Sequence, residues 1–115
     1  MTAPTIDLPT FEALQQTAGA EFVGELVDTF LTEAPLMLDE LREAFAAGNT
    51  ERFRRAAHSL KSNSLTFGAT GLAAMARDLE MGGLAPVRLA SAQPLDALAR
   101  EYSQVAAALT ELRNA

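Results

Sequence analysis

The chain's single histidine, His58, is the side chain best suited to covalent chemistry. If residues 50–66 form a helix, with about 100° between successive residues, His58 points about 150° away from the centre of the apolar face. A neutral imidazole nitrogen is a nucleophile that needs solvent exposure and in-line access more than a deep pocket. We therefore expect a solvent-exposed nucleophile on a rigid helix. The apolar face should consist of Phe53, Ala56, Ala57, Leu60, Ser64 and Phe67.

Basic residues surround His58 in the sequence. Arg54 precedes it by one helical turn and Lys61 follows it by three residues, so both side chains share its face. These cations should disfavour the imidazolium form and attract a phosphoryl group. The pattern favours His58 as a phosphoryl acceptor and Lys61 as the contact to the phosphoryl oxygens. Four of the nine basic residues gather in this segment: Arg52, Arg54, Arg55 and Lys61.

The same face offers residues for docking another protein. Ser59 and Ser62 are small and would allow a partner to approach closely, while Leu65 adds an exposed apolar contact. We expect the docking residues to be Arg54, Arg55, Ser59, Ser62 and Leu65. His58, Lys61 and Leu65 each also have a simpler interpretation, since isolated surface histidines, lysines and leucines are common and usually inert. Ser64 should face the core and donate a hydrogen bond back to its own helix.

Composition excludes several classes of function. The chain has 115 residues, a formal net charge of -6 and no cysteine. The acidic balance argues against nucleic acid as a partner, and the absence of cysteine excludes disulfides and thiolate chemistry. No apolar run is long enough for a membrane span, and the first residues do not resemble a signal peptide, so we expect a cytoplasmic protein.

The sequence shows no catalytic centre for ATP-dependent or hydrolytic chemistry. The segment from Gly68 to Gly71 lacks the Gly-Lys-Ser/Thr of a phosphate-binding loop and is typical of a turn between helices. His58 has no carboxylate partner at helical spacing, so neither a metal site nor a hydrolase triad is predicted. We expect no enzyme activity and no bound cofactor.

Apolar periodicity predicts an all-α fold. A long helix is expected over residues 20–47, with an apolar stripe formed by Phe22, Leu26, Phe30, Leu38, Leu41 and Phe45. Pro35 either kinks this helix or separates two nearly collinear helices, and continuity of the stripe favours the kink. Gly48 and Asn49 form the following turn, where Asn49 or Thr50 caps the next helix.

The remaining elements complete an antiparallel up-down-up-down four-helix bundle with a short N-terminal helix, in one domain over residues 1–115. The short helix should run from Phe11 to Thr17, with Thr10 as its N-cap and Gly19 at its end. The bundle is expected over residues 20–113. The other three bundle helices should cover residues 50–66, from Ala69 or Thr70 to Met81, and residues 91–113, with a loop over 84–90. Residues 1–9 should form an N-terminal arm that Ile6 and Leu8 pack against the bundle.

The segment around His58 resembles the histidine-containing phosphotransfer (HPt) domain family. The resemblance rests on Ala57-His58-Ser59-Leu60-Lys61-Ser62-Asn63-Ser64, then Phe67-Gly68-Ala69, Leu72 and Leu79-Glu80. It implies a four-helix bundle whose phosphoacceptor is His58 and whose phosphate contact is Lys61. Many members have glycine after the lysine, where this chain has Ser62.

The resemblance implies a phosphoryl carrier in a two-component phosphorelay. Such domains take the group from a receiver-domain aspartate or a histidine kinase path and pass it to another receiver, with Mg²⁺ expected on the receiver partner. We expect a monomer with no nucleic-acid or membrane partner. Two alternatives remain open: a helical interaction module whose His58 is never phosphorylated, and a dimeric adaptor that binds and blocks a receiver.

Overall fold

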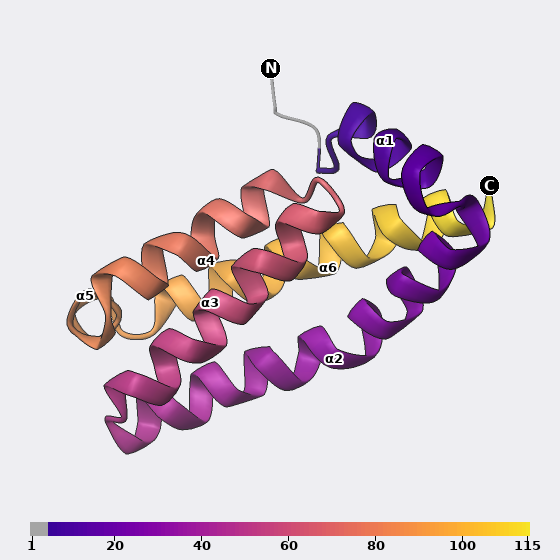
Figure 1. The fold of residues 1–115 in the computed structure, drawn as a ribbon. Helices are drawn as coiled ribbons and strands as arrows, with labels where there is room; N and C mark the ends of the chain where they lie inside the picture. Colours follow the sequence, from indigo (N-terminus) through magenta and orange to yellow (C-terminus); the bar gives the residue numbers. More distant parts are fainter. Residues whose placement is uncertain (1–4) are drawn as a thin grey trace.

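The computed structural model describes residues 5–115 and contains six helices and no strand over that range (Figure 1). The first four residues of the predicted N-terminal arm lie outside the described residues. No helix in the described range combines the length and apolar character that a membrane span requires. The helices are α1 (Leu8–Ala18), α2 (Ala20–Ala47), α3 (Thr50–Thr66), α4 (Thr70–Gly82), α5 (Leu84–Leu89) and α6 (Gln93–Asn114).

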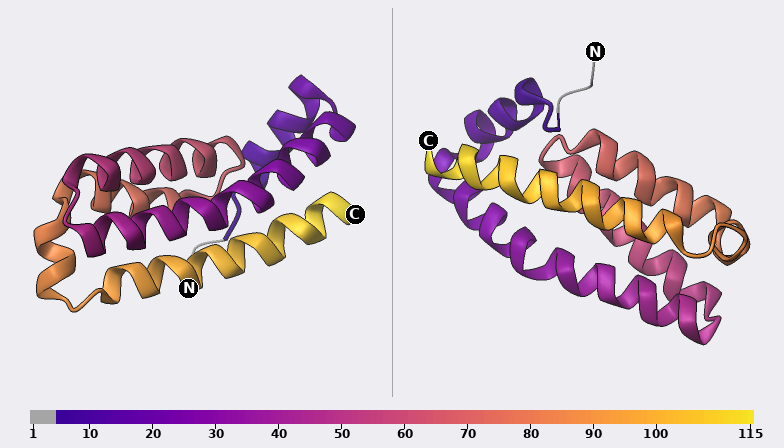
Figure 2. Two further views of the ribbon diagram at one scale, coloured as in Figure 1. Left: turned by 90° about the horizontal axis from the view of Figure 1, so that it is seen from below. Right: turned by 180° about the vertical axis from the view of Figure 1, so that it is seen from behind.

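Four of these helices, α2, α3, α4 and α6, form the predicted antiparallel bundle. Helix α3 packs between α2 and α4, and α6 closes the bundle against α2 and α4 on the opposite side. Figure 2 shows the alternating directions from below and from behind, with α1 lying across the end where the C-terminus also lies. The predicted all-α fold is confirmed. This arrangement places the outward face of α3 on the surface, flanked by α2 and α4.

One hydrophobic cluster joins all six helices. The predicted stripe of α2 is shifted by one residue near its start, because Val23 and Val27 occupy the core while Phe22 is about half exposed. A step of four residues fits both registers, so periodicity alone could not separate them. The largest fully buried side chains include Phe53, Leu41, Leu60, Leu72 and Leu98.

Pro35 lies inside one continuous α2, so the single-helix alternative is correct. Proline has no backbone N–H, which leaves the carbonyl of Leu31, four residues earlier, without its helical donor. The hydroxyl of Tyr102 on α6 donates to that carbonyl oxygen at 3.4 Å. Burial raises the pKa of Tyr102, so the hydroxyl keeps its proton. Thus α6 compensates for the proline in α2.

Helix α1 begins earlier than predicted. Its N-cap is Asp7, whose carboxylate accepts hydrogen bonds from the backbone N–H of Thr10, at 3.2 Å, and from the Thr10 hydroxyl. Thr10 is therefore not the N-cap, because Pro9 fits the first helical turn without needing a donor. Of the two arm residues expected to pack, Ile6 is buried, whereas Leu8 is about half exposed.

The start of α1 is attached to the turn between α3 and α4. The backbone N–H of Asp7 donates to the Gly68 carbonyl at 2.8 Å, and Gly68 has a φ of 80°. A Cβ on Gly68 would lie 2.8 Å from the Asp7 carbonyl oxygen. Gly68 thus combines left-handed backbone with a close approach to another segment.

Gly68→Ala is expected to lower the free energy of unfolding by at least about 1–2 kcal/mol, the cost of left-handed backbone for a residue with a Cβ. Urea unfolding should show a lower midpoint with a similar slope. Gly19→Ala is the matched control, because it also has a positive φ, but a Cβ there meets no atom of residues 5–115 within 4 Å. Equal destabilisation of the two variants would contradict a role for the contact with Asp7.

The segment over 84–90, predicted as a loop, contains the short helix α5. Leu84 and Val87 lie three residues apart and are both buried, which anchors one turn of helix against the bundle. Pro86 lies in the first turn of α5, where backbone N–H groups have no acceptor within the helix, so the proline removes no helical hydrogen bond. Helix α6 begins at Gln93 rather than at residue 91, because Ser91 and Ala92 both adopt positive φ.

Candidate functional site

His58 lies in the middle of α3 and points away from the bundle. Its side chain is 59% exposed. The buried residues of α3 are Phe53, Ala56, Ala57, Leu60 and Ser64, which matches the predicted apolar face. Ser64 donates its hydroxyl to the Leu60 carbonyl at 2.6 Å, as predicted. The packing on the opposite side of α3 therefore fixes the helix that carries the imidazole.

A carboxylate contacts both His58 and Lys61. Glu80, near the end of α4, has one carboxylate oxygen 2.7 Å from His58 Nδ1, and the other accepts from Lys61 Nζ at 2.8 Å. The sequence prediction covered only helical spacing on α3 and so did not include this carboxylate. The partner comes from the neighbouring helix α4. Leu79-Glu80 belonged to the motif that carried the family resemblance, but no role had been assigned to Glu80.

The contact fixes which imidazole nitrogen is free. The Lys61 hydrogen bond, followed by that of His58, lowers the pKa of Glu80, so the group is a carboxylate at neutral pH. A carboxylate only accepts hydrogen bonds, so the neutral ring must carry its proton on Nδ1. The Nε2 lone pair is then the available nucleophile. As pH falls through the lowered pKa, protonation removes the charge that holds both partners, so this arrangement is lost in acid.

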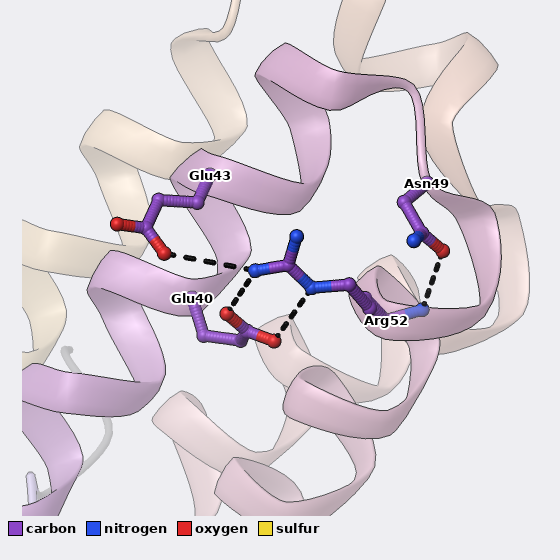
Figure 3. A network of polar contacts seen from close by, with 4 residues as sticks. All are labelled: Glu40, Glu43, Asn49 and Arg52. Atoms are coloured by element: carbon purple, nitrogen blue, oxygen red, sulfur yellow. Dashed lines mark hydrogen bonds and ion pairs between the residues drawn. The ribbon is translucent and has the colours of Figure 1, made fainter.

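Arg52 does not belong to the cationic surroundings of His58. Its guanidinium makes two hydrogen bonds to Glu40 on α2, at 3.0 and 2.5 Å, and lies 3.6 Å from Glu43 (Figure 3). Asn49 caps α3 by accepting from the backbone N–H of Arg52 at 3.1 Å. The ion pair raises the pKa of Arg52 and lowers that of Glu40. Arg52 thus joins α2 to α3, so three of the four cations in the predicted cluster remain beside His58.

Three predicted docking residues do gather around His58. Arg54, Arg55 and Ser59 line a shallow depression of about 350 Å³ together with His58, Glu51 and Glu80. Arg54 Nε donates to the Glu80 backbone carbonyl at 3.3 Å. The surroundings therefore contain cations and carboxylates, rather than the cations alone that the sequence suggested.

The other two predicted docking residues lie outside this depression. Ser62 and Leu65 are both exposed farther along α3, and the Leu65 side chain is 51% exposed. From His58 to Leu65, α3 rises about 10 Å. The outward face of α3 thus extends from the imidazole to an exposed apolar residue.

An apolar groove on the α2 side of His58 was missed in the sequence. It has a volume of about 420 Å³ and shares Arg55 and Ser59 with the depression around His58. Leu36 and Met37 of α2 line it, and Leu36 is one of the exposed large apolar side chains. Leu36 directly follows Pro35, and no periodic signal distinguished it as a surface residue.

Comparisons with known proteins identify the family of the chain. The family model of the Hpt domain matches residues 25–115. The structure is similar to the crystal structure of histidine-containing phosphotransfer protein B (HptB) from Pseudomonas aeruginosa PAO1, with 28% sequence identity and a TM-score of 0.83 over 98% of this chain and 97% of that one. No curated protein sequence matches the chain. The chain belongs to the Hpt domain family, whose members are phosphotransfer carriers of two-component signalling and not kinases.

Proposed function

We propose that this chain is a phosphorelay intermediate that accepts a phosphoryl group on His58 from a receiver-domain aspartate and passes it to another receiver. The observation that carries the proposal is the exposed imidazole whose Nδ1 lies 2.7 Å from Glu80, so that Nε2 is the nitrogen left for the reaction. Family membership supports the same reaction class. We expect the relay to operate in the cytoplasm.

The proposed transfer follows from the protonation state of the ring. Nε2 attacks the phosphorus of the aspartyl phosphate, an N–P bond forms, and the P–O bond to the aspartate breaks to release a carboxylate. The ring keeps its Nδ1 proton and becomes positively charged. Glu80 lies against that proton and would stabilise the positive charge of the ring. Lys61, one turn after His58 and in contact with the same carboxylate, would contact the phosphoryl oxygens. Transfer to the next receiver is the reverse step.

The chain requires no cofactor of its own in this scheme. The receiver would supply Mg²⁺ to the transferring phosphoryl group, which spreads negative charge over its oxygens. In the proposed complex, Arg54, Arg55, Ser59, Ser62 and Leu65 face the receiver around His58. The apolar groove with Leu36 and Met37 adjoins this surface, and its area would add contact for a transient interface.

The test is transfer from phosphorylated receiver domains to the purified chain. Label on this chain should be acid-labile and base-stable, and peptide mapping should place it on His58. An adaptor module, phosphorylated on no residue, would bind receivers without acquiring label. If no receiver from the same genome transfers label to the wild-type chain, the relay proposal is wrong.

Lys61→Ala is expected to slow transfer by roughly tenfold or more, because a charge-assisted hydrogen bond to the phosphoryl oxygens is lost. The helical circular dichroism spectrum and unfolding midpoint should change little, since a surface ion pair contributes only about 0–1 kcal/mol. Arg77→Ala, an exposed cation on α4, is the matched control and should transfer normally. A Lys61→Ala chain with the wild-type rate would remove Lys61 from the reaction.

A further inference from the structure

A cationic groove lies beside the His58 site, at the end of the bundle where α4 meets α5. Its volume is about 470 Å³, and within residues 5–115 its charged lining residues are Arg54 and Arg88. A Cβ built on Gly48 would lie 3.8 Å from Arg88 Nη2, so the guanidinium of Arg88 extends from α5 to the turn between α2 and α3. Gly48, Gly82 and Gly83 contribute only backbone, which keeps the groove open.

Four cations of the chain, Lys61 among them, pair with a carboxylate, whereas Arg54 and Arg88, like Arg55, Arg77 and Arg100, have no such partner within residues 5–115. Arg42, Arg52 and Arg113 each pair with a carboxylate, at 2.9, 2.5 and 2.7 Å respectively. Over residues 5–115, no carboxylate lies within ion-pair distance of Arg54 or Arg88. The chain has 15 acidic residues against nine basic ones, so two arginines without acidic partners in one groove leave a local positive potential on an acidic protein.

The groove is continuous with the phosphoryl-acceptor site through Arg54. This side chain lines both the groove and the depression around His58, and it lies one helical turn, about 6 Å along the axis, from the imidazole. A protein that covers His58 must therefore cover Arg54 and reach the edge of the groove.

Exposed apolar side chains around the groove favour a protein over a small anion. Met81 lines the groove and is 67% exposed, and Leu89, next to Arg88 on α5, is 88% exposed. Apolar contacts flanking a charged pair are typical of protein interfaces, in which charges at the rim set partner choice and association rate.

We propose that Arg54 and Arg88 form a receptor for an acidic side chain of the receiver domain that docks over His58, and that this contact selects among receivers. The inference rests on the proposed function, because it names part of the surface by which the same partner binds. It assigns Arg88, on the short helix α5, a role in specificity. Arg54 shares the contact, whereas the apolar groove between α2 and α3 lies on the other side of His58.

The experiment measures receiver binding separately from chemistry. Each variant is placed in a His58→Gln chain, which cannot accept the phosphoryl group, and its affinity and association rate for a receiver that labels the wild-type chain are measured at low and high salt. Arg88→Glu is expected to weaken binding about tenfold, mainly through slower association, and to reduce the salt dependence. Arg100→Glu on α6 makes the same charge change on the far side of the bundle from α3 and should bind like the parent.

The outcomes separate the two proposals. Equal receiver affinities for the Arg88→Glu and Arg100→Glu chains, with transfer to His58 intact in the wild type, would overturn the groove assignment and leave the relay standing. If Arg88→Glu weakens the binding of inorganic phosphate but leaves receiver affinity unchanged, the groove binds a small anion, and the groove assignment is also overturned. If no receiver binds or labels the wild-type chain, both proposals are wrong. Unchanged thermal unfolding of Arg88→Glu would confirm that the variant is folded.

Discussion

A His58→Gln chain is expected to acquire no phosphoryl label from any receiver that labels the wild-type chain. A glutamine amide has no nucleophilic lone pair comparable to that of imidazole, so the N–P bond cannot form. His58 is the only histidine, so no neighbouring imidazole can replace it. The expected effect is loss of label to background, measured by phosphorimaging after quenching in base, where phosphohistidine survives.

The fold of this variant should be intact, because the side chain is 59% exposed and its side-chain hydrogen bond is to Glu80. Unfolding by urea should give a midpoint close to wild type, since surface substitutions usually change stability by less than about 0.5 kcal/mol. Arg100→Gln, an exposed change on α6, is the control for an added glutamine and should be labelled normally. Persistent label in His58→Gln would move the acceptor to another residue.

The elements that position His58 were predictable from local sequence signals. The bounds of α2 and α3 follow from Gly48, which ends one helix in left-handed backbone, and from Asn49, which caps the next. The outward direction of His58 follows from the apolar residues of α3, since the period of a helix fixes which side chains share a face. These signals act within a few residues, so no knowledge of the tertiary structure was needed.

The features that were missed depend on contacts between helices. Glu80 reaches His58 only because α4 packs against α3 in one particular register, and the exposure of Phe22 depends on which of two possible faces of α2 meets the bundle. Arg52 was counted in the basic patch near His58 for the same reason, since its partner Glu40 lies on another helix. Helix α5 was predicted as a loop, although Pro86 lies in its first turn, where a proline is compatible with a helix.

Glu80→Ala should slow phosphoryl transfer by on the order of 10²-fold, which is the size of effect expected when a reacting group is misplaced by about 1 Å. The substitution removes the acceptor that keeps the proton on His58 Nδ1 and leaves Nε2 as the nucleophile. It also releases Lys61 from its 2.8 Å contact. Without the carboxylate, the two neutral tautomers of the ring become closer in population, the imidazole rotates more freely, and the charge of the phosphorylated ring loses a stabilising partner.

The measurement that isolates this positioning role combines transfer rate with the nitrogen chemical shifts of His58. In the wild-type chain at neutral pH, the shifts should report a proton on Nδ1, and Glu80→Ala should move them toward a mixture of tautomers. Asp78→Ala, an exposed acidic residue on the same helix, removes one negative charge without touching the imidazole and should alter neither quantity. Glu80→Gln keeps the shape and an accepting oxygen, so it should recover part of the Nδ1 tautomer but less of the rate, because the charge that balances the phosphorylated ring is absent. A Glu80→Ala chain with both the wild-type tautomer and the wild-type rate would show that the carboxylate contributes nothing to the reaction.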